Sequence, residues 1–476
     1  MPDDDTPPNA PLPLVVALEG GLTGVNTLHE AVAARLSAAP AEAPRLLGLA
    51  RSGRLRAAMA EDAPLDPAAL PLHEEVLERL RAARAEGRAT ALLAADARLG
   101  EAVAGALGLF DEVLAPETPD PAAAAALPGA RFGAGGYVFI GPAADRAAFA
   151  GAAEASTVRA APAARKAAEA LAPGAGHIAP RPGGAAALKP WIKALRPRQW
   201  AKNALIFAPL LAAHQAAGFG AALAAFVAFS LLASSVYLVN DMLDLKADRA
   251  HPRKRARPFA AGDVPIGPGA GVAAGLVAVS ILVALLFTPL AFLGVLAAYY
   301  VLTWAYSLTL KRKLILDIWT LSALYTIRIV AGAAATALPL SPWMLGFSIF
   351  LFLSLAAVKR MAELEDQIKR GVEQTAGRAY RTDDLPVVRG LAMSTGTASV
   401  LALALYISSP EAQALYSSPT LLWFVCVLML YWVSRMVMVT HRGDMDDDPV
   451  VFAMKDRVSL SVLVLCALSF VAAGAL

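Results

Sequence analysis

Apolar residues gather in long runs in the second half of the chain. A stretch such as FGAALAAFVAFSLLASSVYLV has the length, roughly 20 residues, that spans a bilayer core as a helix. The second half is therefore expected to be a multi-pass, all-α membrane protein. The pattern predicts nine transmembrane helices, near residues 203–216, 218–241, 268–286, 289–308, 315–335, 343–360, 390–408, 418–437 and 458–475.

The first part of the chain has shorter apolar runs that alternate with amphipathic stretches. PLVVALEG, ATALLAA and GGYVFIG each predict a short buried strand, and LHEEVLERLRAARAEG predicts an amphipathic helix that ends at a glycine. Strands alternating with helices indicate a soluble α/β domain with a parallel sheet. We expect this domain over residues 1–155, an Ala/Pro/Gly-rich linker over 156–188, and the transmembrane domain over 189–476.

Composition supports this division. Of the 476 residues, 57% are hydrophobic and 17% are charged, whereas about a quarter of a soluble protein is charged. The net charge of +3 does not suggest a nucleic-acid partner, and we expect none. Cys426 and Cys466 lie in apolar runs, so neither a disulfide framework nor a zinc site is predicted. The start, MPDDDTPPNAP, does not predict a signal peptide.

Lysine and arginine alternate between the connections of the predicted helices. HPRKRARP, KRK, KRMAELEDQIKRG and MKDR fall in every second connection, and the connections between them contain no Lys or Arg. By the positive-inside rule, the N-terminal domain is expected in the cytoplasm and Leu476 outside, in a cell (inner) membrane.

Three acids stand at the end of the second predicted membrane helix, in LVNDMLDLKADRAHPRKRARPFAAGDV. On a continuous helix Asp244 lies about 60° from Asp241, and Asp248 about 20°, so all three share one face, flanked by Asn240. Hard oxygen ligands on one face suit Mg²⁺, which bridges carboxylates to substrate phosphates.

A basic run follows the acids and can hold the phosphate oxygens that the metal leaves free. Together the three acids and the basic run predict a Mg²⁺–diphosphate site. The alternative is a solvated loop whose basic residues anchor to anionic lipid.

The stretch NDMLDLKADRAHPRKRARPFAAG resembles the first aspartate-rich motif of the UbiA superfamily of intramembrane prenyltransferases, a resemblance that covers roughly residues 190 to 476. It implies a bundle of nine transmembrane helices around a cavity, with Mg²⁺ as the cofactor that holds a diphosphate. The residues implied at the metal side are Asn240, Asp241, Asp244 and Asp248, and those implied to contact phosphate are Lys254 and Arg257.

Three further stretches, LRPRQWAKN, YSLTLKRKLILDIWTL and KRMAEL, are similar to the decaprenyl-phosphate phosphoribosyltransferase branch. That branch implies transfer of 5-phosphoribose from phosphoribosyl pyrophosphate to a polyprenyl phosphate lipid. The second aspartate motif of quinone-pathway members is missing, since Lys359 and Arg360 open the 6–7 loop and Asp383–Asp384 lie well downstream. These two cations suit a reaction with more phosphate to bind.

Two other function classes stay open at this point. One is an aromatic polyprenyltransferase of the quinone type, which uses a polyprenyl diphosphate. The other is a transporter or non-catalytic membrane scaffold, although a transporter more naturally shows broken helices near the midplane. The sequence also leaves a homo-oligomer open.

Five other polar residues of the membrane part are candidates for substrate or phosphate binding. Arg328, deep in the fifth predicted helix, needs water or a partner, and is expected to face a cavity, toward Asp317 or a substrate phosphate; a structural pair is the alternative. The other four could equally be interfacial anchors, and the resemblance favours binding roles for them: Lys202, Asn203, Tyr306 and Lys311.

The N-terminal stretch PLVVALEGGLTGVNTLHE resembles the first motif of haloacid-dehalogenase (HAD)-type phosphatases. That motif implies two aspartates, a nucleophile and a general acid, where this chain has Ala17 and Glu19. Leu93 stands where a hydroxyl is expected, and the metal-binding loop retains only Asp145. We therefore expect a HAD-like, Rossmannoid domain without phosphatase activity.

Overall fold

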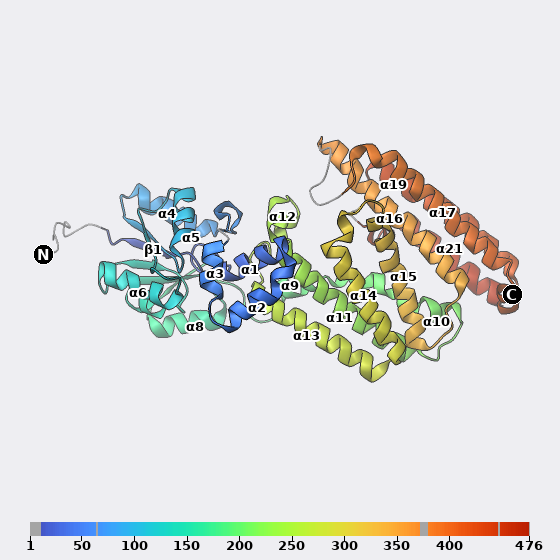
Figure 1. Ribbon diagram of the computed structural model, residues 1–476, viewed down its shortest axis with the longest axis horizontal. Helices are drawn as coiled ribbons and strands as arrows, with labels where there is room; N and C mark the ends of the chain where they lie inside the picture. Colours follow the sequence, from blue (N-terminus) through green and yellow to red (C-terminus); the bar gives the residue numbers. More distant parts are fainter. Residues whose placement is uncertain (1–10, 63–64, 372–378, 446–447, 476) are drawn as a thin grey trace. The chain divides into compact units, whose positions relative to one another are not determined.

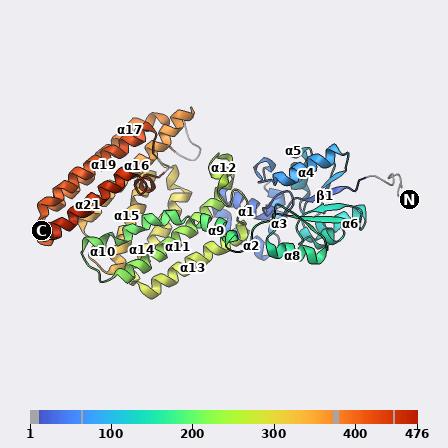
Figure 2. The same cartoon turned by 180° about the vertical axis from the view of Figure 1, so that it is seen from behind.

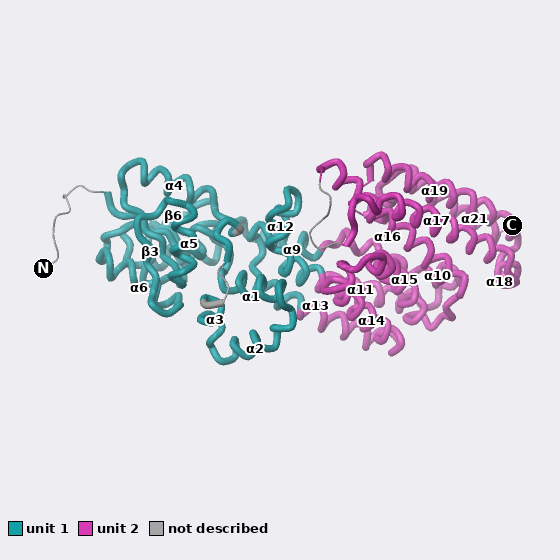
Figure 3. Tube along the Cα trace, turned by 45° about the horizontal axis from the view of Figure 1, so that its top comes forward, with its two compact units in different colours: residues 1–195, 237–273 teal, residues 196–236, 274–476 magenta. Residues whose placement is uncertain are grey.

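The computed structural model describes residues 11–62, 65–371, 379–445 and 448–475 (Figure 1). The chain divides into two compact units, shown in different colours in Figure 3. The first unit comprises residues 1–195 and 237–273, and the second comprises 196–236 and 274–476. The segment with the three acids therefore groups with the N-terminal domain.

A six-stranded parallel sheet forms the centre of the first unit, with strand order β3-β2-β1-β4-β5-β6. This is the order of a doubly wound sheet, which confirms the predicted α/β domain. Three strands coincide with the predicted apolar runs, and the other three were not predicted. The strands are β1 Leu14–Ala17, β2 Thr90–Leu93, β3 Glu112–Leu114, β4 Val138–Ile140, β5 Glu154–Val158 and β6 Gly176–Ile178.

The helices of this unit cover both faces of the sheet. Successive side chains of β1 point to opposite faces, so Leu14 and Val16 pack with α4 and α5, whereas Val15 and Ala17 pack with α6, α7 and α8. Figures 1 and 2 show α4 on one side of the sheet and α6 and α8 on the other. The helices are α1 Thr27–Ala38, α2 Ala43–Arg51, α3 Leu55–Asp62, α4 Glu74–Ala85, α5 Ala97–Leu107, α6 Pro121–Phe132, α7 Arg146–Ala150, α8 Pro162–Leu171, α9 Ala185–Leu195 and α12 Leu245–Ala250, with 3-10 turns η1 Pro40–Glu42, η2 Pro67–Ala69 and η4 Lys254–Ala256.

The expected linker over residues 156–188 is wrong for most of its length. It contains the end of β5, all of α8 and all of β6, and β6 pairs in parallel with β5. The alanine-rich stretch forms a helix because alanine has the highest helix propensity and Pro162 stands at the first turn, where proline is tolerated.

The second unit is all-helical. Its α16 packs against α15, α17 and α19, and α19 packs against α21. Helices α11 and α13 contribute to both units, since each crosses a unit boundary. The remaining elements are η3 Pro197–Phe207, α10 Ala208–Ala212, α11 Phe219–Leu243, α13 Ile266–Phe287, α14 Leu290–Leu308, η5 Leu310–Arg312, α15 Leu316–Thr336, α16 Pro342–Arg370, η6 Thr382–Asp384, α17 Leu385–Ile407, α18 Pro410–Leu415, η7 Pro419–Leu422, α19 Trp423–Arg442, α20 Pro449–Ala453 and α21 Arg457–Ala475.

Among the described residues, eight helices are long and apolar enough to cross a membrane, against nine expected. The eight agree with the predicted spans, and the exception is 203–216. There the chain forms η3 and the short α10, which is followed by His214 with a positive φ of 50°. Pro209, which lies inside the expected span and has no backbone N–H to donate, and this left-handed residue disfavour one long helix.

Helix α16 is longer than predicted. It continues through Lys359 and Arg360 to Arg370, so these two cations lie within a helix and not in a loop. The chain after residue 360 is rich in Glu, Gln, Lys and Arg, which favour helix, and it ends at Gly371 in the left-handed conformation.

Candidate functional site

Two of the three acids at the end of α11 are buried. Asp241 is 3% exposed and Asp248 is 2% exposed, whereas Asp244 is half-buried. Helix α11 ends at Leu243 and α12 begins two residues later. The i to i−4 backbone bonds continue across this break, from Asp244 N to Asn240 O (2.9 Å) and from Asp248 N to Asp244 O (2.8 Å). Helical spacing therefore persists through the acidic segment.

Arg257 joins the two buried acids. Its Nη1 donates to Asp248 Oδ2 at 2.7 Å and to Asp241 Oδ1 at 3.2 Å. Burial raises the pKa of Asp248, and Asp241 acts in the same direction, while Arg257 opposes both. The carboxylates of Asp241 and Asp248 thus share the Arg257 guanidinium, whose positive charge offsets the repulsion between the two acids.

The expected set of three metal ligands is not assembled in the part of the chain that the structure describes, where no three His, Cys, Asp or Glu side chains are grouped closely enough to hold a metal. Asp241 and Asp248 nevertheless converge on one cationic nitrogen. Because Mg²⁺ commonly binds one or two carboxylates and completes its shell with phosphate and water, this pair fits the ion together with a diphosphate.

Two other predicted site residues, Asn240 and Lys254, lie in the same segment. Asn240 is half-buried on α11 and engaged in other interactions, and Lys254 is exposed on η4. Lys254 shares a short stretch with Arg257, whose guanidinium already contacts the acids.

The second unit contains a separate cluster of buried charges. Lys202, on η3, is 8% exposed and forms an ion pair through Nζ with Asp448, at the N-cap of α20. The same Nζ lies 5.5 Å from the ring centroid of Tyr325, whose hydroxyl contacts Asp448 Oδ1 at 3.4 Å. Lys202 is therefore held in place within apolar helices by one carboxylate and one aromatic ring.

Arg328 lies next to this pair, but its partners differ from those expected. Its Nε donates to Asn203 Oδ1 at 2.8 Å, and Asn203 Nδ2 donates to Ser230 Oγ at 2.9 Å. The guanidinium lies over three aromatic rings, the nearest being Phe229 at 5.2 Å to its centroid. Of the two partners expected for Arg328, Asp317 pairs with Arg360 instead, and a substrate phosphate stays a prediction.

Arg360 and Asp317 form a buried ion pair. Arg360 Nη2 lies 2.6 Å from Asp317 Oδ2, and Arg360 also pairs with Glu363. Tyr380 donates its hydroxyl to Asp317 Oδ1 at 2.7 Å. The charge of Arg360 is therefore balanced by acids of its own unit, in contrast to the free phosphate-binding cation that the sequence predicted.

The other predicted cations keep more exposure. Lys359, one residue before Arg360, is half-buried and lies near enough to Lys202 and Asp448 to affect both electrostatically. Tyr306 near the end of α14 and Lys311 in η5 are also half-buried.

Gly332 allows η3, which contains Lys202, to pack closely against α15, which contains Arg328. A Cβ on Gly332 of α15 would lie 2.0 Å from the carbonyl oxygen of Ile206 on η3. Because the glycine has no side chain, η3 with Lys202 can pack directly on α15 with Arg328.

Positive charge exceeds negative charge in this cluster, which is made of Lys202, Arg328, Lys359 and Asp448. Lys359, Arg328 and Asp448 all lie near enough to Lys202 to act on it electrostatically. Burial alone would raise the pKa of Asp448, but Lys202 and Lys359 lower it overall. Three cations beside one carboxylate are suited to accept a further anion.

Asp448 was missed by the sequence reasoning. The signal available was DMDDD, an acidic run in a connection otherwise read as basic from MKDR. Its partner Lys202 lies 246 positions away in the sequence, so no local spacing relates the two.

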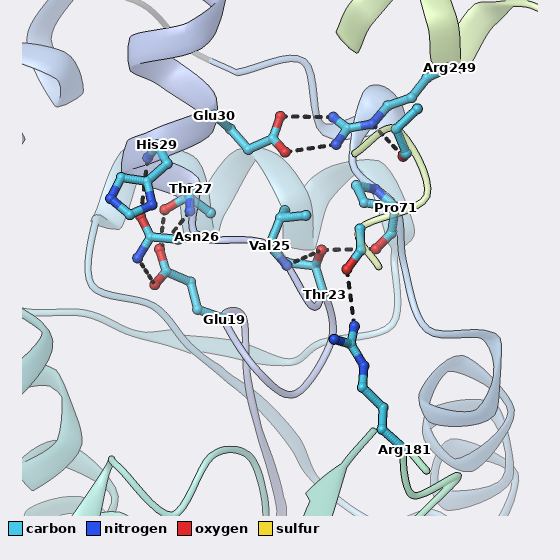
Figure 4. Close-up of polar contacts among 12 residues, drawn as sticks. Glu19, Thr23, Val25, Asn26, Thr27, His29, Glu30, Pro71, Arg181 and Arg249 are labelled. Carbon is cyan, nitrogen blue, oxygen red and sulfur yellow. Dashed lines mark hydrogen bonds and ion pairs between the residues drawn. The ribbon is translucent and has the colours of Figure 1, made fainter. Parts of the chain in front are cut away.

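The positions expected to match the phosphatase motifs lie at the carboxyl edge of the sheet. Ala17 ends β1, Leu93 ends β2, and Asp145 follows β4. Glu19 Oε1 accepts from the Thr27 backbone N at 2.9 Å and from the Thr27 hydroxyl, and Oε2 accepts from Asn26 (Figure 4). Burial and the nearby Glu19 raise the pKa of Asp145 to about 6.

The chain belongs to the UbiA prenyltransferase family, whose sequence profile matches residues 204–473. It is 37% identical over 279 residues to the decaprenyl-phosphate phosphoribosyltransferase of Mycolicibacterium smegmatis, covering 56% of this chain and 86% of that protein. It is 35% identical over 286 residues to the nodulation protein NoeC of Azorhizobium caulinodans, covering 59% of this chain and 92% of that protein.

A third relative is longer than the matched region. Protein y4nM of Sinorhizobium fredii is 37% identical over 290 residues, and the chain spans 56% of its length. Among solved structures, a UbiA homologue from Archaeoglobus fulgidus bound to GPP and Mg²⁺ matches with a TM-score of 0.44 and 13% identity, over 59% of this chain and 99% of that one.

Family membership and the eight apolar helices together define an integral membrane protein and a UbiA-family transferase. The family profile covers most of the expected transmembrane domain, residues 189–476. The resemblance found in the aspartate-rich segment is thus confirmed at the level of the family.

Proposed function

We propose that the protein transfers 5-phosphoribose from phosphoribosyl pyrophosphate to a polyprenyl phosphate, with Mg²⁺ as cofactor. The observation that carries this proposal is a buried cluster with more cations than acids. Lys202 pairs with Asp448 and lies with Arg328 over the ring of Tyr325, and Lys359 acts electrostatically on Lys202 and Asp448. A donor with a diphosphate and an acceptor with a phosphate need more cationic partners than an uncharged aromatic acceptor does. The relatives named decaprenyl-phosphate phosphoribosyltransferase support the same assignment.

The acidic segment is proposed to bind the diphosphate of the donor. Asp241 and Asp248 would hold Mg²⁺, with Asp244 and Asn240 beside them, and the bound ion would neutralise the pyrophosphate leaving group. Arg257 and Lys254 would hold phosphate oxygens that the ion leaves free.

The reaction requires positioning and charge stabilisation more than covalent participation by the protein. The bond between ribose C1 and the pyrophosphate oxygen breaks, and the electron pair leaves with pyrophosphate. An oxygen of the lipid phosphate forms the new bond to C1 from the opposite face. Lys202 and Arg328, fixed by Asp448 and Asn203, can hold a phosphate group at a set place, and such preorganised cations favour charged transition states.

The experiment supplies purified protein in lipid with labelled phosphoribosyl pyrophosphate, Mg²⁺ and a polyprenyl phosphate. Label should enter the lipid fraction, and prenylation of 4-hydroxybenzoate from a polyprenyl diphosphate should stay at background. The reverse outcome would identify an aromatic prenyltransferase, and no transfer in either assay would contradict the proposal.

A pair of aspartate variants ties this activity to the acidic segment. Asp241→Asn should lower transfer by about 100-fold or more, because it removes a positioned electrostatic group. Asp383→Asn, at an aspartate whose side chain is 87% exposed, should retain wild-type activity.

We also propose that residue 1 is cytoplasmic and Leu476 external; both lie outside the described residues. The alternating loop charges support this orientation. With eight long helices, it requires that η3 and α10 together form a ninth crossing. Reporter fusions should read residue 1 as internal and Leu476 as external; both ends on one side would show that residues 197–212 do not cross.

A further inference from the structure

A buried ion pair connects the N-terminal sheet domain to the segment that follows the acids. Arg249 donates from Nη2 to Glu30 Oε1 at 2.7 Å and from Nη1 to Glu30 Oε2 at 2.9 Å (Figure 4). The side chains are 11% and 3% exposed. Glu30 belongs to the first turn of α1, and Arg249 immediately follows Asp248. A buried bidentate ion pair fixes both the distance and the relative orientation of the Arg249 and Glu30 side chains.

Further contacts of the same domain reach what we call the basic segment, residues 249–263. Arg181 donates from Nη2 to the Gly262 carbonyl at 3.0 Å and from Nη1 to the Asp263 carbonyl at 3.3 Å. Lys193 donates to the Ala256 carbonyl at 2.7 Å. Arg249 Nε also donates to the carbonyl of Ala260, within the segment. The basic segment is therefore held at its start, its middle and its end.

Packing leaves little room for the segment to shift. Gly262 has a φ of +73°, and a Cβ there would lie 3.2 Å from Val25. Farther on, a Cβ on Gly267 would lie 2.7 Å from the ring of His29. Both neighbours belong to the loop and helix that carry Glu30, so the backbone after the acids lies directly against this part of the domain.

Glu19, at the carboxyl edge of the sheet, supports the ion pair between Glu30 and Arg249. Glu19 accepts from the backbone N and hydroxyl of Thr27 and from the amide of Asn26, and Asn26 in turn caps α1 through the His29 backbone N. Glu19 thereby fixes the first turn of α1, which contains Glu30 (Figure 4). The side chain placed where a phosphatase has its second acid serves to orient the helix that contacts Arg249.

We propose that the N-terminal domain is a scaffold that holds the basic segment in place, and that Glu30 is a positioning residue for the diphosphate site. Glu30 fixes Arg249, and the segment so held presents Arg257 to Asp241 and Asp248. The link to diphosphate rests on the proposed function; the holding of the segment rests only on the contacts above. Removing the carboxylate leaves a buried arginine unpaired, which favours movement of the segment.

Glu30→Gln tests this in the full-length protein, and Glu42→Gln is the matched control. Glu42 pairs with Arg35 at 2.9 Å in the same domain. Two measurements are made on each variant. Hydrogen exchange with mass spectrometry follows peptides from the basic segment, and calorimetry measures pyrophosphate binding in the presence of Mg²⁺.

Glu30→Gln should speed exchange in the basic segment while peptides from β1 and β2 stay as in the wild type. It should weaken pyrophosphate binding by about 10- to 100-fold, the usual effect of removing a residue that orients a ligand-binding group. Arg249→Lys keeps the charge but loses the bidentate contact, so its exchange rate and pyrophosphate affinity should lie between those of the wild type and Glu30→Gln. Glu42→Gln should match the wild type in both measurements.

Wild-type exchange rates in the basic segment of Glu30→Gln would contradict the proposed scaffold role of the domain. Faster exchange with unchanged pyrophosphate affinity would contradict the proposed role of Glu30 as a positioning residue. If the wild-type protein itself fails to bind pyrophosphate, the proposed diphosphate site is wrong, while the exchange comparison still decides whether the domain holds the segment.

Discussion

A buried charge must have a partner, and this requirement organises both units of the protein. Removing one member of a buried pair leaves an uncompensated charge, which destabilises a protein by about 3–5 kcal/mol. Asp241 and Asp248 meet this requirement through Arg257, and Lys202 meets it through Asp448. Asp448 lies 246 positions from Lys202, whereas Arg257 follows Asp248 by 9 positions, so the ion pairs fix both distant and neighbouring segments.

The two charged clusters differ in sign, and this difference gives each its chemistry. Near the acids, two carboxylates share one guanidinium, an arrangement that a divalent cation can join. Around Asp448 the cations are in excess, an arrangement that an anion can join. A transferase that handles a metal-bound diphosphate and a second phosphate needs both kinds of site. Arg360 has neither property, because Asp317 and Glu363 balance it.

The sequence predicted features that depend on local pattern. Strands β1, β2 and β4, eight of the membrane helices, and a shared face for Asp241 and Asp248 follow from periodicity and apolar length. It failed where long-range contacts or local breaks decide the outcome. The pairs of Lys202 with Asp448 and of Arg360 with Asp317 join distant segments. The contact of Arg257 with Asp241 and Asp248 forms across the chain that follows α12, which helical periodicity does not predict.

The central claim is that Asp241 and Asp248 together bind a divalent metal with a diphosphate. Titration of the purified protein with Mn²⁺ in the presence of pyrophosphate, followed by electron paramagnetic resonance, measures this without any transfer reaction. Asp241→Asn and Asp248→Asn should each weaken Mn²⁺ binding by at least about 10-fold, whereas Asp383→Asn should bind as the wild type does. Wild-type Mn²⁺ affinity in both Asp241→Asn and Asp248→Asn would contradict metal binding by these two acids.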